Sequence, residues 1–126
     1  EGGTTIVKYE IHQIHLTDEE IDKVNAEGHY SVDSNRLSIE MTTRHKQIVP
    51  LAQEAWSKGY FTHVANIKTK RGLSGVFQIG NIGLSGDPEE SLQRLSEMHS
   101  VSVGDIVKDE HGTMFVCDNL GWKEVS

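Results

Sequence analysis

The sequence predicts an α+β fold, in which a mostly antiparallel sheet carries two or three short helices and ends in a C-terminal β-meander. Three observations lead to this class, and the first two are patterns: strand-like and helix-like patterns alternate up to residue 100, and strand-like patterns alone follow from Val101 to Val125. The third is size, since 126 residues with 36 % hydrophobic content suit one domain with its own core. We expect residues 1–3 to be a remnant of processing or cloning and residues 4–126 to form that single domain.

Residues 4–16 predict the first strand, because they are rich in Ile, Val, Tyr and Thr. Tyr9 and Ile11 share one face of such a strand, whereas Ile14 and Leu16 share the other. This change of phase between residues 11 and 14 indicates a β-bulge or burial on both sides of the strand.

A capped helix is predicted next. Thr17 and Glu20 have the spacing of a capping box, in which each residue bonds the backbone N–H of the other. Ile21 and Val24 supply the apolar stripe of this helix, and Gly28 is expected to end it.

The middle of the chain predicts a strand followed by a second helix. Residues 37–41 alternate apolar Leu, Ile and Met with polar residues, which indicates a half-buried strand. Apolar residues at helical spacing predict a helix over residues 48–58, with Gly59 after its end. Pro50 must lie in the first turn, because deeper in the helix it would remove a backbone hydrogen bond.

A hairpin is predicted beyond Gly59. Residues 60–67 and 75–82 are interpreted as two strands joined by a basic tip at residues 68–71. The sequence Gly-Leu-Ser-Gly occurs at residues 72–75 and again at 83–86, which indicates two similar turns and not a structural repeat.

The last third of the chain predicts one more helix and then the β-meander. Asp87-Pro88 opens the helix, which carries Leu92 and Leu95. The meander has a strand at 106–107, a turn at 109–112, a strand at 114–116, a turn at 119–121 and a last short strand from Trp122.

Composition and charge argue against several classes of partner. Nineteen acidic against twelve basic side chains give a net charge of −7, which disfavours nucleic-acid binding. The basic run at 68–71 fits a solvated loop tip, with a small phosphate or RNA contact as the alternative. No apolar run approaches the roughly 18–20 residues that span a bilayer, so we expect neither a membrane partner nor a secretion leader. A single cysteine excludes an internal disulfide framework and indicates a reducing compartment.

The C-terminal residues carry a sequence pattern of two parts. The first part is Ser100, Ser102, Asp105, Ile106 and Val107, and the second is Gly112, Phe115, Val116, Asp118, Gly121, Trp122, Lys123 and Glu124. This pattern resembles a YodL-like module of bacteriophage and mobile-element proteins, whose form is S-x-S-x-x-D-x-V followed by V-D-x-x-G-F-K-E. Here one residue is inserted after Val116, and Trp122 stands where the pattern has Phe.

Two further segments resemble small uncharacterised proteins of marine cyanophages. They are residues 9–17 (YEIHQIHLT) and residues 60–65 (YFTHVA). Neither resemblance implies catalytic residues. What they imply is a setting, namely a phage gene expressed in the cytoplasm of a bacterial host cell.

Seven histidines suggest a metal site as one hypothesis. His12 and His15 are three residues apart on a predicted strand, so they point to opposite faces unless the bulge realigns them. His63 lies on another predicted strand and joins them if the two strands pair. The spacing matches neither a zinc finger nor an H-E-x-x-H helix, so we expect no bound metal and no other cofactor.

Other candidate residues have simpler interpretations. Cys117 is expected to be a core residue, because no basic neighbour or helix N-terminus would activate its thiol. Residues 80–86 are interpreted as a loop and not as a phosphate-binding motif. Asp105 and Asp118 belong to the C-terminal pattern, as do Gly121 and Trp122, whose roles stay unassigned. The two aspartates are interpreted either as turn residues or as a carboxylate pair facing one another across the meander.

The leading hypothesis is a non-enzymatic phage accessory protein that binds a host or phage protein through Trp56 and Tyr60. It is based on the small size, the acidic charge, the lack of catalytic motifs and the phage resemblance. The alternative is a small ligand- or metal-binding domain, or an enzyme, that uses His12, His15 and His63. A third hypothesis is a homo-oligomer formed through exposed strand edges.

Overall fold

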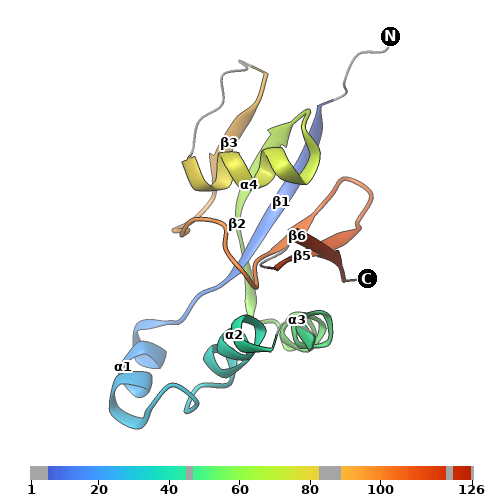
Figure 1. Ribbon diagram of the computed structural model, residues 1–126. Helices are drawn as coiled ribbons and strands as arrows, with labels where there is room; N and C mark the ends of the chain where they lie inside the picture. Colours follow the sequence, from blue (N-terminus) through green and yellow to red (C-terminus); the bar gives the residue numbers. More distant parts are fainter. Residues whose placement is uncertain (1–5, 45–46, 83–88, 119–120, 126) are drawn as a thin grey trace.

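A computed structural model describes residues 6–44, 47–82, 89–118 and 121–125 and shows the α+β fold that the sequence predicts (Figure 1). Within these residues the helices are α1 (Asp18–Glu27), α2 (Asp33–Thr43), α3 (Ile48–Ser57) and α4 (Gly72–Ile82). The strands are β1 (Val7–Ile14), β2 (Phe61–Thr69), β3 (Ser91–Arg94), β4 (Ile106–Lys108), β5 (Met114–Asp118) and β6 (Gly121–Glu124). Among the described helices, none is both long and apolar enough to cross a membrane.

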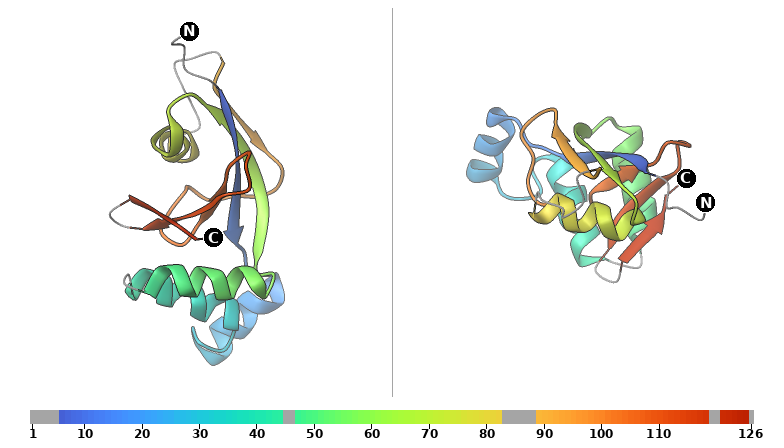
Figure 2. Two further views of the ribbon diagram at one scale, coloured as in Figure 1. Left: turned by 90° about the vertical axis from the view of Figure 1, so that its right-hand side faces the viewer. Right: turned by 90° about the horizontal axis from the view of Figure 1, so that it is seen from above.

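The described strands form one antiparallel sheet in the order β3-β2-β1-β4-β5-β6. β1 lies inside the sheet and pairs with β2 along one edge and with β4 along the other. The last three strands confirm the predicted β-meander, because each pairs with the next along the chain. β5 and β6 turn away from the direction of β1 and β2, so the sheet is curved (Figure 2).

A β-bulge lies between β1 and β2, but the change of apolar phase along β1 comes from the other predicted cause, burial on both of its faces. Ile11 lies opposite Ala65, but the next residue, His12, lies opposite His63. Val64 is therefore the extra residue of the bulge, and it belongs to β2. Since β1 has no inserted residue, its side chains keep alternating between the two faces of the sheet.

Apolar side chains form two cores on opposite faces of the sheet. Ile106 and Val107 are neighbours on β4, so they point to opposite faces, and each belongs to a different core. The core that contains Val107 is covered by α4 through Val76 and Ile79. The core that contains Ile106 is covered by α2 and α3. Figures 1 and 2 accordingly show α4 on one side of β5 and β6, and α2 and α3 on the other.

Two predicted helices are confirmed. α1 begins with the capping box, in which the Glu20 N–H donates to Thr17 Oγ1 at 3.1 Å and the Thr17 N–H donates to Glu20 Oε1 at 2.9 Å. α1 nevertheless buries none of its residues, and Ile21 is 43 % exposed. α3 begins at Ile48, which places Pro50 in its first turn as predicted.

The strand predicted for residues 37–41 is wrong, because these residues form part of α2. Leu37 and Met41 are four residues apart, lie on one face of the helix and are fully buried. Ile39, between them, is only half-buried. The alternating pattern failed because apolar residues at i and i+4 also satisfy the helical period.

The strand predicted for residues 75–82 is also wrong, because residues 72–82 form α4. Two glycines let this helix pack closely against the end of β2 and the segment before β4. A Cβ at Gly75 would collide with Thr69, and a Cβ at Gly80 would collide with Val101. Gly75, which indicated a turn in the sequence, is therefore a packing residue, and the loop predicted at 80–86 begins inside a helix. Residues 83–86 lie outside the described part of the chain.

The helix predicted to carry Leu92 and Leu95 is replaced by β3. Leu92 lies opposite Ile67 of β2 and packs against the core beneath α4, whereas Leu95 is 48 % exposed. Pairing with β2 decides the structure of this segment, and its own sequence gives no such signal. The Asp87-Pro88 helix start lies outside the described residues.

The helical assignment of residues 33–43 predicts a specific pattern of stability losses. We expect Leu37→Ala to lower the free energy of unfolding by about 2–5 kcal/mol, because it opens a cavity among fully buried neighbours. Ile39→Ala should lower the free energy of unfolding clearly less, because Ile39 is only half-buried. Urea denaturation followed by circular dichroism measures both losses, and equal losses for the two variants would support the strand.

A candidate metal site on the central strands

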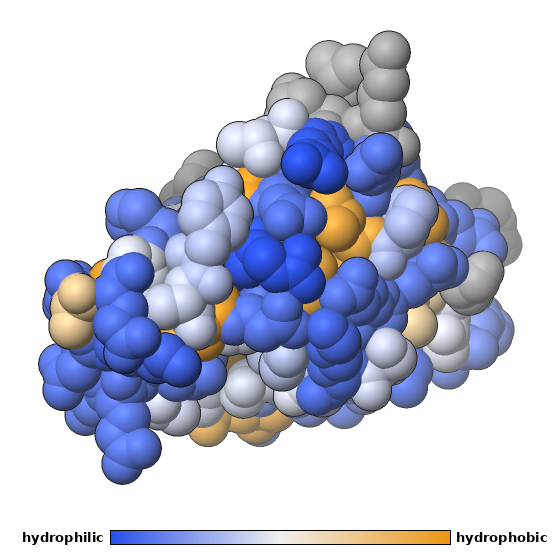
Figure 3. Space-filling model, turned by 90° about the horizontal axis from the view of Figure 1, so that it is seen from below, coloured by the Kyte–Doolittle hydropathy of each residue, from blue (hydrophilic) through white to orange (hydrophobic). Residues whose placement is uncertain are grey.

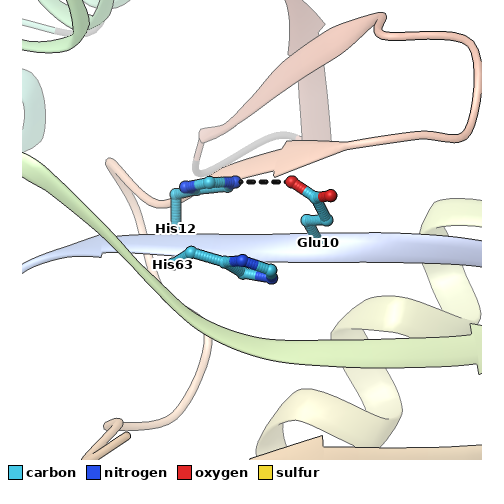
Figure 4. A group of neighbouring side chains, drawn as sticks. All are labelled: Glu10, His12 and His63. Carbon is cyan, nitrogen blue, oxygen red and sulfur yellow. Dashed lines mark hydrogen bonds and ion pairs between the residues drawn. The ribbon is translucent and has the colours of Figure 1, made fainter. Parts of the chain in front are cut away.

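The register of β1 and β2 brings together two histidines and a glutamate. His12 lies directly opposite His63, and Glu10 lies two residues before His12, on the same face of β1. Each of the three residues offers one ligand atom, and these atoms lie within 4.8 Å of one another (Figure 4). His12 Nε2 is 3.1 Å from Glu10 Oε1, and the rings of His12 and His63 stack with their centroids 4.9 Å apart.

A chain of hydrogen bonds orients the ring of His63. The Asn66 amide donates through Nδ2 to Gln93 Oε1 at 3.2 Å, which turns its Oδ1 toward His63 Nε2 at 2.8 Å. In the tautomer whose Nε2–H donates to this oxygen, Nδ1 keeps its lone pair. Histidines that bind metals are commonly held in the same way, by a hydrogen bond to the other ring nitrogen.

The electrostatic surroundings keep His12 neutral and Glu10 charged. Burial lowers the pKa of His12, and the hydrogen bond with Glu10 offsets only part of this shift. At Glu10 burial raises the pKa, but the hydrogen bond with His12 and the charges of His63 and Lys108 outweigh it, so the pKa lies below its ordinary value. A neutral imidazole and an ionised carboxylate are the forms that bind metal ions.

The cluster opens into a pocket of about 310 Å³ lined by His12, Trp56, Gly59, Phe61 and His63. Trp56 comes from the end of α3 and meets the His12 ring edge-on, with centroids 4.9 Å apart. Its ring centroid is 5.8 Å from that of Phe61. The pocket is therefore polar where the two histidines lie and apolar along the other walls.

The structure separates the third predicted histidine from this site. His15 stacks on His99, with centroids 5.7 Å apart, and bonds Gln13 at 3.3 Å. The bulge cannot realign His15 with His12, because its extra residue lies in β2. Glu10 takes the place of His15 in the cluster. The alternation of β1 puts Glu10 and His12 on one face, so this partner was accessible to the sequence analysis, which missed it.

The two residues predicted to bind a protein partner have internal contacts. The Tyr60 hydroxyl donates to Asp33 Oδ2 at 2.7 Å, and Lys58 Nζ lies 2.8 Å from the same oxygen. Hydrogen bonds from Lys58, Tyr60 and Arg36 hold the pKa of Asp33 well below its usual value. Tyr60 thus helps to fix α2 against α3, while the half-buried Trp56 forms a wall of the pocket.

The basic tip is largely paired with acidic residues. Arg71 Nη2 lies 3.1 Å from Glu90 Oε1, and Lys70 Nζ lies 3.0 Å from Glu89 Oε1. Glu90 also accepts the backbone N–H of Lys70 at 3.0 Å. These ion pairs tie the end of β2 to the segment before β3, which favours a structural role for the basic run.

The aspartates of the C-terminal pattern bind different partners. Asp118 forms an ion pair with Lys123 at 2.9 Å. Cys117, next to it, is buried, and burial together with the charges of Asp105 and Asp118 raises the pKa of its thiol to about 11. Gly121 has a φ of 131°, which favours glycine, and the half-buried Trp122 packs against the core beneath α4.

Asp105 belongs to a buried polar cluster around Gln13. Its Oδ2 accepts hydrogen bonds from Gln13 Nε2 at 3.0 Å and from the Ser102 N–H at 2.9 Å. Gln13 Nε2 also donates to the His99 carbonyl at 2.9 Å, and the His99 N–H donates to Gln13 Oε1 at 3.2 Å. The cluster fastens the segment before β4 to β1. Burial raises the pKa of Asp105 to about 6, although these hydrogen bonds act in the opposite direction.

Comparisons with known proteins yield no relative. No protein-family model, no curated protein and no solved structure matches the chain. The resemblance to YodL-like modules and to cyanophage proteins stays a prediction, and the function is argued from the geometry of the site.

The buried Asp105 carboxyl predicts an unusual pH dependence of stability. Because its pKa is about 6 in the folded chain and 3.8 as the ordinary value, the folded protein binds more protons between these pH values. This group therefore contributes stability as pH falls from about 6 to about 4. Asp105→Asn keeps an acceptor for Gln13 and Ser102 and removes the titration.

At pH 7 we expect Asp105→Asn to have a higher free energy of unfolding than wild type. This difference should shrink by about 2 to 3 kcal/mol between pH 7 and pH 4. Urea denaturation at several pH values measures it. Asp22→Asn, at an exposed position of α1, is the control, and its free energy of unfolding should depend on pH as that of wild type does. If the difference between Asp105→Asn and wild type did not change with pH, the pKa of Asp105 would not be raised in the folded protein.

Proposed function

We propose that this domain binds one divalent transition-metal ion through Glu10, His12 and His63. The observation that carries the proposal is the convergence of three ligand atoms within 4.8 Å of one another. Two of the ligands lie on β1 and the third on β2, so the backbone hydrogen bonds of the sheet hold their Cα positions. Among the described residues, this is the group of His, Cys, Asp and Glu side chains that meets this geometry.

The donor set favours Zn²⁺ and its first-row neighbours. Imidazole nitrogen and carboxylate oxygen together suit Zn²⁺, Fe²⁺ or Co²⁺, whereas Mg²⁺ and Ca²⁺ prefer oxygen alone. Zinc bonds of about 2.0–2.1 Å place tetrahedral ligand atoms about 3.3 Å apart. A metal ion would replace the proton shared by His12 Nε2 and Glu10 Oε1, whose 3.1 Å separation is close to this value. Rotation of the His63 side chain would complete the set.

Three protein ligands leave at least one coordination position for another molecule. Structural zinc sites usually have four protein ligands, whereas catalytic and ligand-exchanging sites have three and a water. The pocket beside His12 and His63 gives such a molecule access. The proposed function is therefore a metal site with an open coordination position, and not a structural metal site.

The proposed setting is the cytoplasm of a phage-infected bacterial cell, and the support for it is the C-terminal sequence pattern. Binding of a host or phage protein stays a prediction. Large exposed apolar residues of the described chain lie on separate elements, at Ile21, Tyr30, Phe77 and Leu95. On the face seen from below Figure 1, where α1, α2 and α3 lie, hydrophobic residues show as small areas separated by hydrophilic ones (Figure 3). These observations favour the metal site as the first function to test.

Metal titration of tag-free, chelator-treated protein tests the proposal. We expect one Zn²⁺ or Co²⁺ per chain by isothermal titration calorimetry. His12→Ala and His63→Ala should each weaken binding at least about tenfold, because removal of a direct ligand costs no less than removal of its hydrogen-bond partner. Affinity should fall at acidic pH, where protons compete for the imidazoles, although the lowered pKa of His12 delays this loss.

His15→Ala is the matched control. His15 is close to His12 in the sequence, but its ring stacks on His99, outside the proposed metal site. It should leave the metal affinity unchanged. The proposal fails if wild-type protein binds no stoichiometric metal, or if His15→Ala weakens binding as much as His12→Ala.

A further inference from the structure

We infer that the metal site takes a small carboxylate ligand whose apolar ring occupies the pocket lined by Trp56 and Phe61. This inference rests on the proposed metal site and names the class of molecule that fills its open coordination position. Three observations lead to it: the charge of the loaded site, the chemistry of the pocket walls and the size of the pocket.

The charge of the site favours an anionic donor. A divalent ion with one carboxylate ligand, Glu10, and two neutral imidazoles leaves one net positive charge. Lys108 lies opposite Glu10 on β4, and its charge acts on both Glu10 and His12. The acidic groups nearby on the β4–β5 turn are engaged elsewhere: Glu110 accepts the Lys8 N–H at 2.9 Å, and Asp109 accepts two backbone N–H groups of the turn.

The walls of the pocket favour an aromatic body. Trp56 and Phe61 are both half-buried, so each offers part of its ring to a ligand. Aromatic rings attract one another in offset or edge-to-face geometry, beyond the effect of burial alone. The apolar side of the pocket therefore offers two aromatic rings for contact with a ligand.

The size of the pocket limits the ligand to a small molecule. A volume of about 310 Å³ lies at the lower end of the roughly 300–1,000 Å³ typical of small-molecule sites. A carboxylate attached to a single ring, such as benzoate, is small enough for a pocket of this volume. Acetate has the same donor but no ring, and benzylamine has the ring but a positive charge.

The experiment uses Co²⁺-loaded protein whose one-to-one metal content has first been established by calorimetry. Benzoate, acetate and benzylamine are then titrated, and the visible absorption of Co²⁺ reports any change in coordination. We expect benzoate to change the spectrum and to bind at least about tenfold more tightly than acetate, while benzylamine leaves the spectrum unchanged.

Trp56→Ala separates the ring contact from the metal contact. Once the Co²⁺ content of this variant has been established by calorimetry, we expect it to reduce the preference for benzoate over acetate to about onefold. Phe77→Ala, which removes an exposed aromatic ring from α4, is the control and should retain that preference. If Trp56→Ala does not fold, the comparison of benzoate with acetate on wild-type protein decides alone.

The outcomes distinguish this inference from the proposed function. If Co²⁺ binds but benzoate and acetate bind equally, or neither changes the spectrum, the inference fails and the metal site stands. If Co²⁺ does not bind, both fail. Benzoate binding of equal strength to metal-free protein would place the ligand away from the metal and overturn the inference.

Discussion

The antiparallel register of β1 against β2 is the constraint on which the rest of the structure depends. One extra residue, Val64, shifts this register between Ile11 and His12. Before the shift the paired residues Ile11 and Ala65 face the core beneath α4. After it, His12 meets His63 and completes the cluster with Glu10. A register moved by one residue would turn every side chain of β1 to the other face, so core and site would be lost together.

The same register produces two histidine pairs with different chemistry. His12 and His63 lie at the mouth of a pocket and have a carboxylate beside them. His15 and His99 lie around the buried amide of Gln13, which is hydrogen-bonded to the backbone of His99 and to Asp105. The first pair has nitrogen donors and room for a ligand, whereas the second fastens a loop to the sheet. Identical residue types thus differ in role because β1 sends alternate side chains to opposite faces.

Helices on both faces of the curved sheet support the site from a distance. α4 can approach one face because Gly75 and Gly80 leave no side chain in the way. On the other face, α3 brings Trp56 to the edge of His12, and the contacts of Asp33 with Lys58 and Tyr60 fix α2 against the end of α3. The apolar wall of the pocket is therefore as firmly placed as the ligands, which lie on paired strands.

The sequence by itself determined the elements whose signals are local. The capping box of α1, the helix around Pro50, the C-terminal meander and the burial of β1 on both faces are each encoded by neighbouring residues. Tertiary structure decided the rest. Residues 37–41 satisfy both the helical and the strand period, so only burial of Leu37 and Met41 against α3 selects the helix. The glycines of α4 are packing residues only once a sheet lies beneath them, and β3 exists because β2 offers a free edge. The site follows the same rule: its histidines could be named in advance, but their convergence with Glu10 depends on strand pairing between residues far apart in the chain.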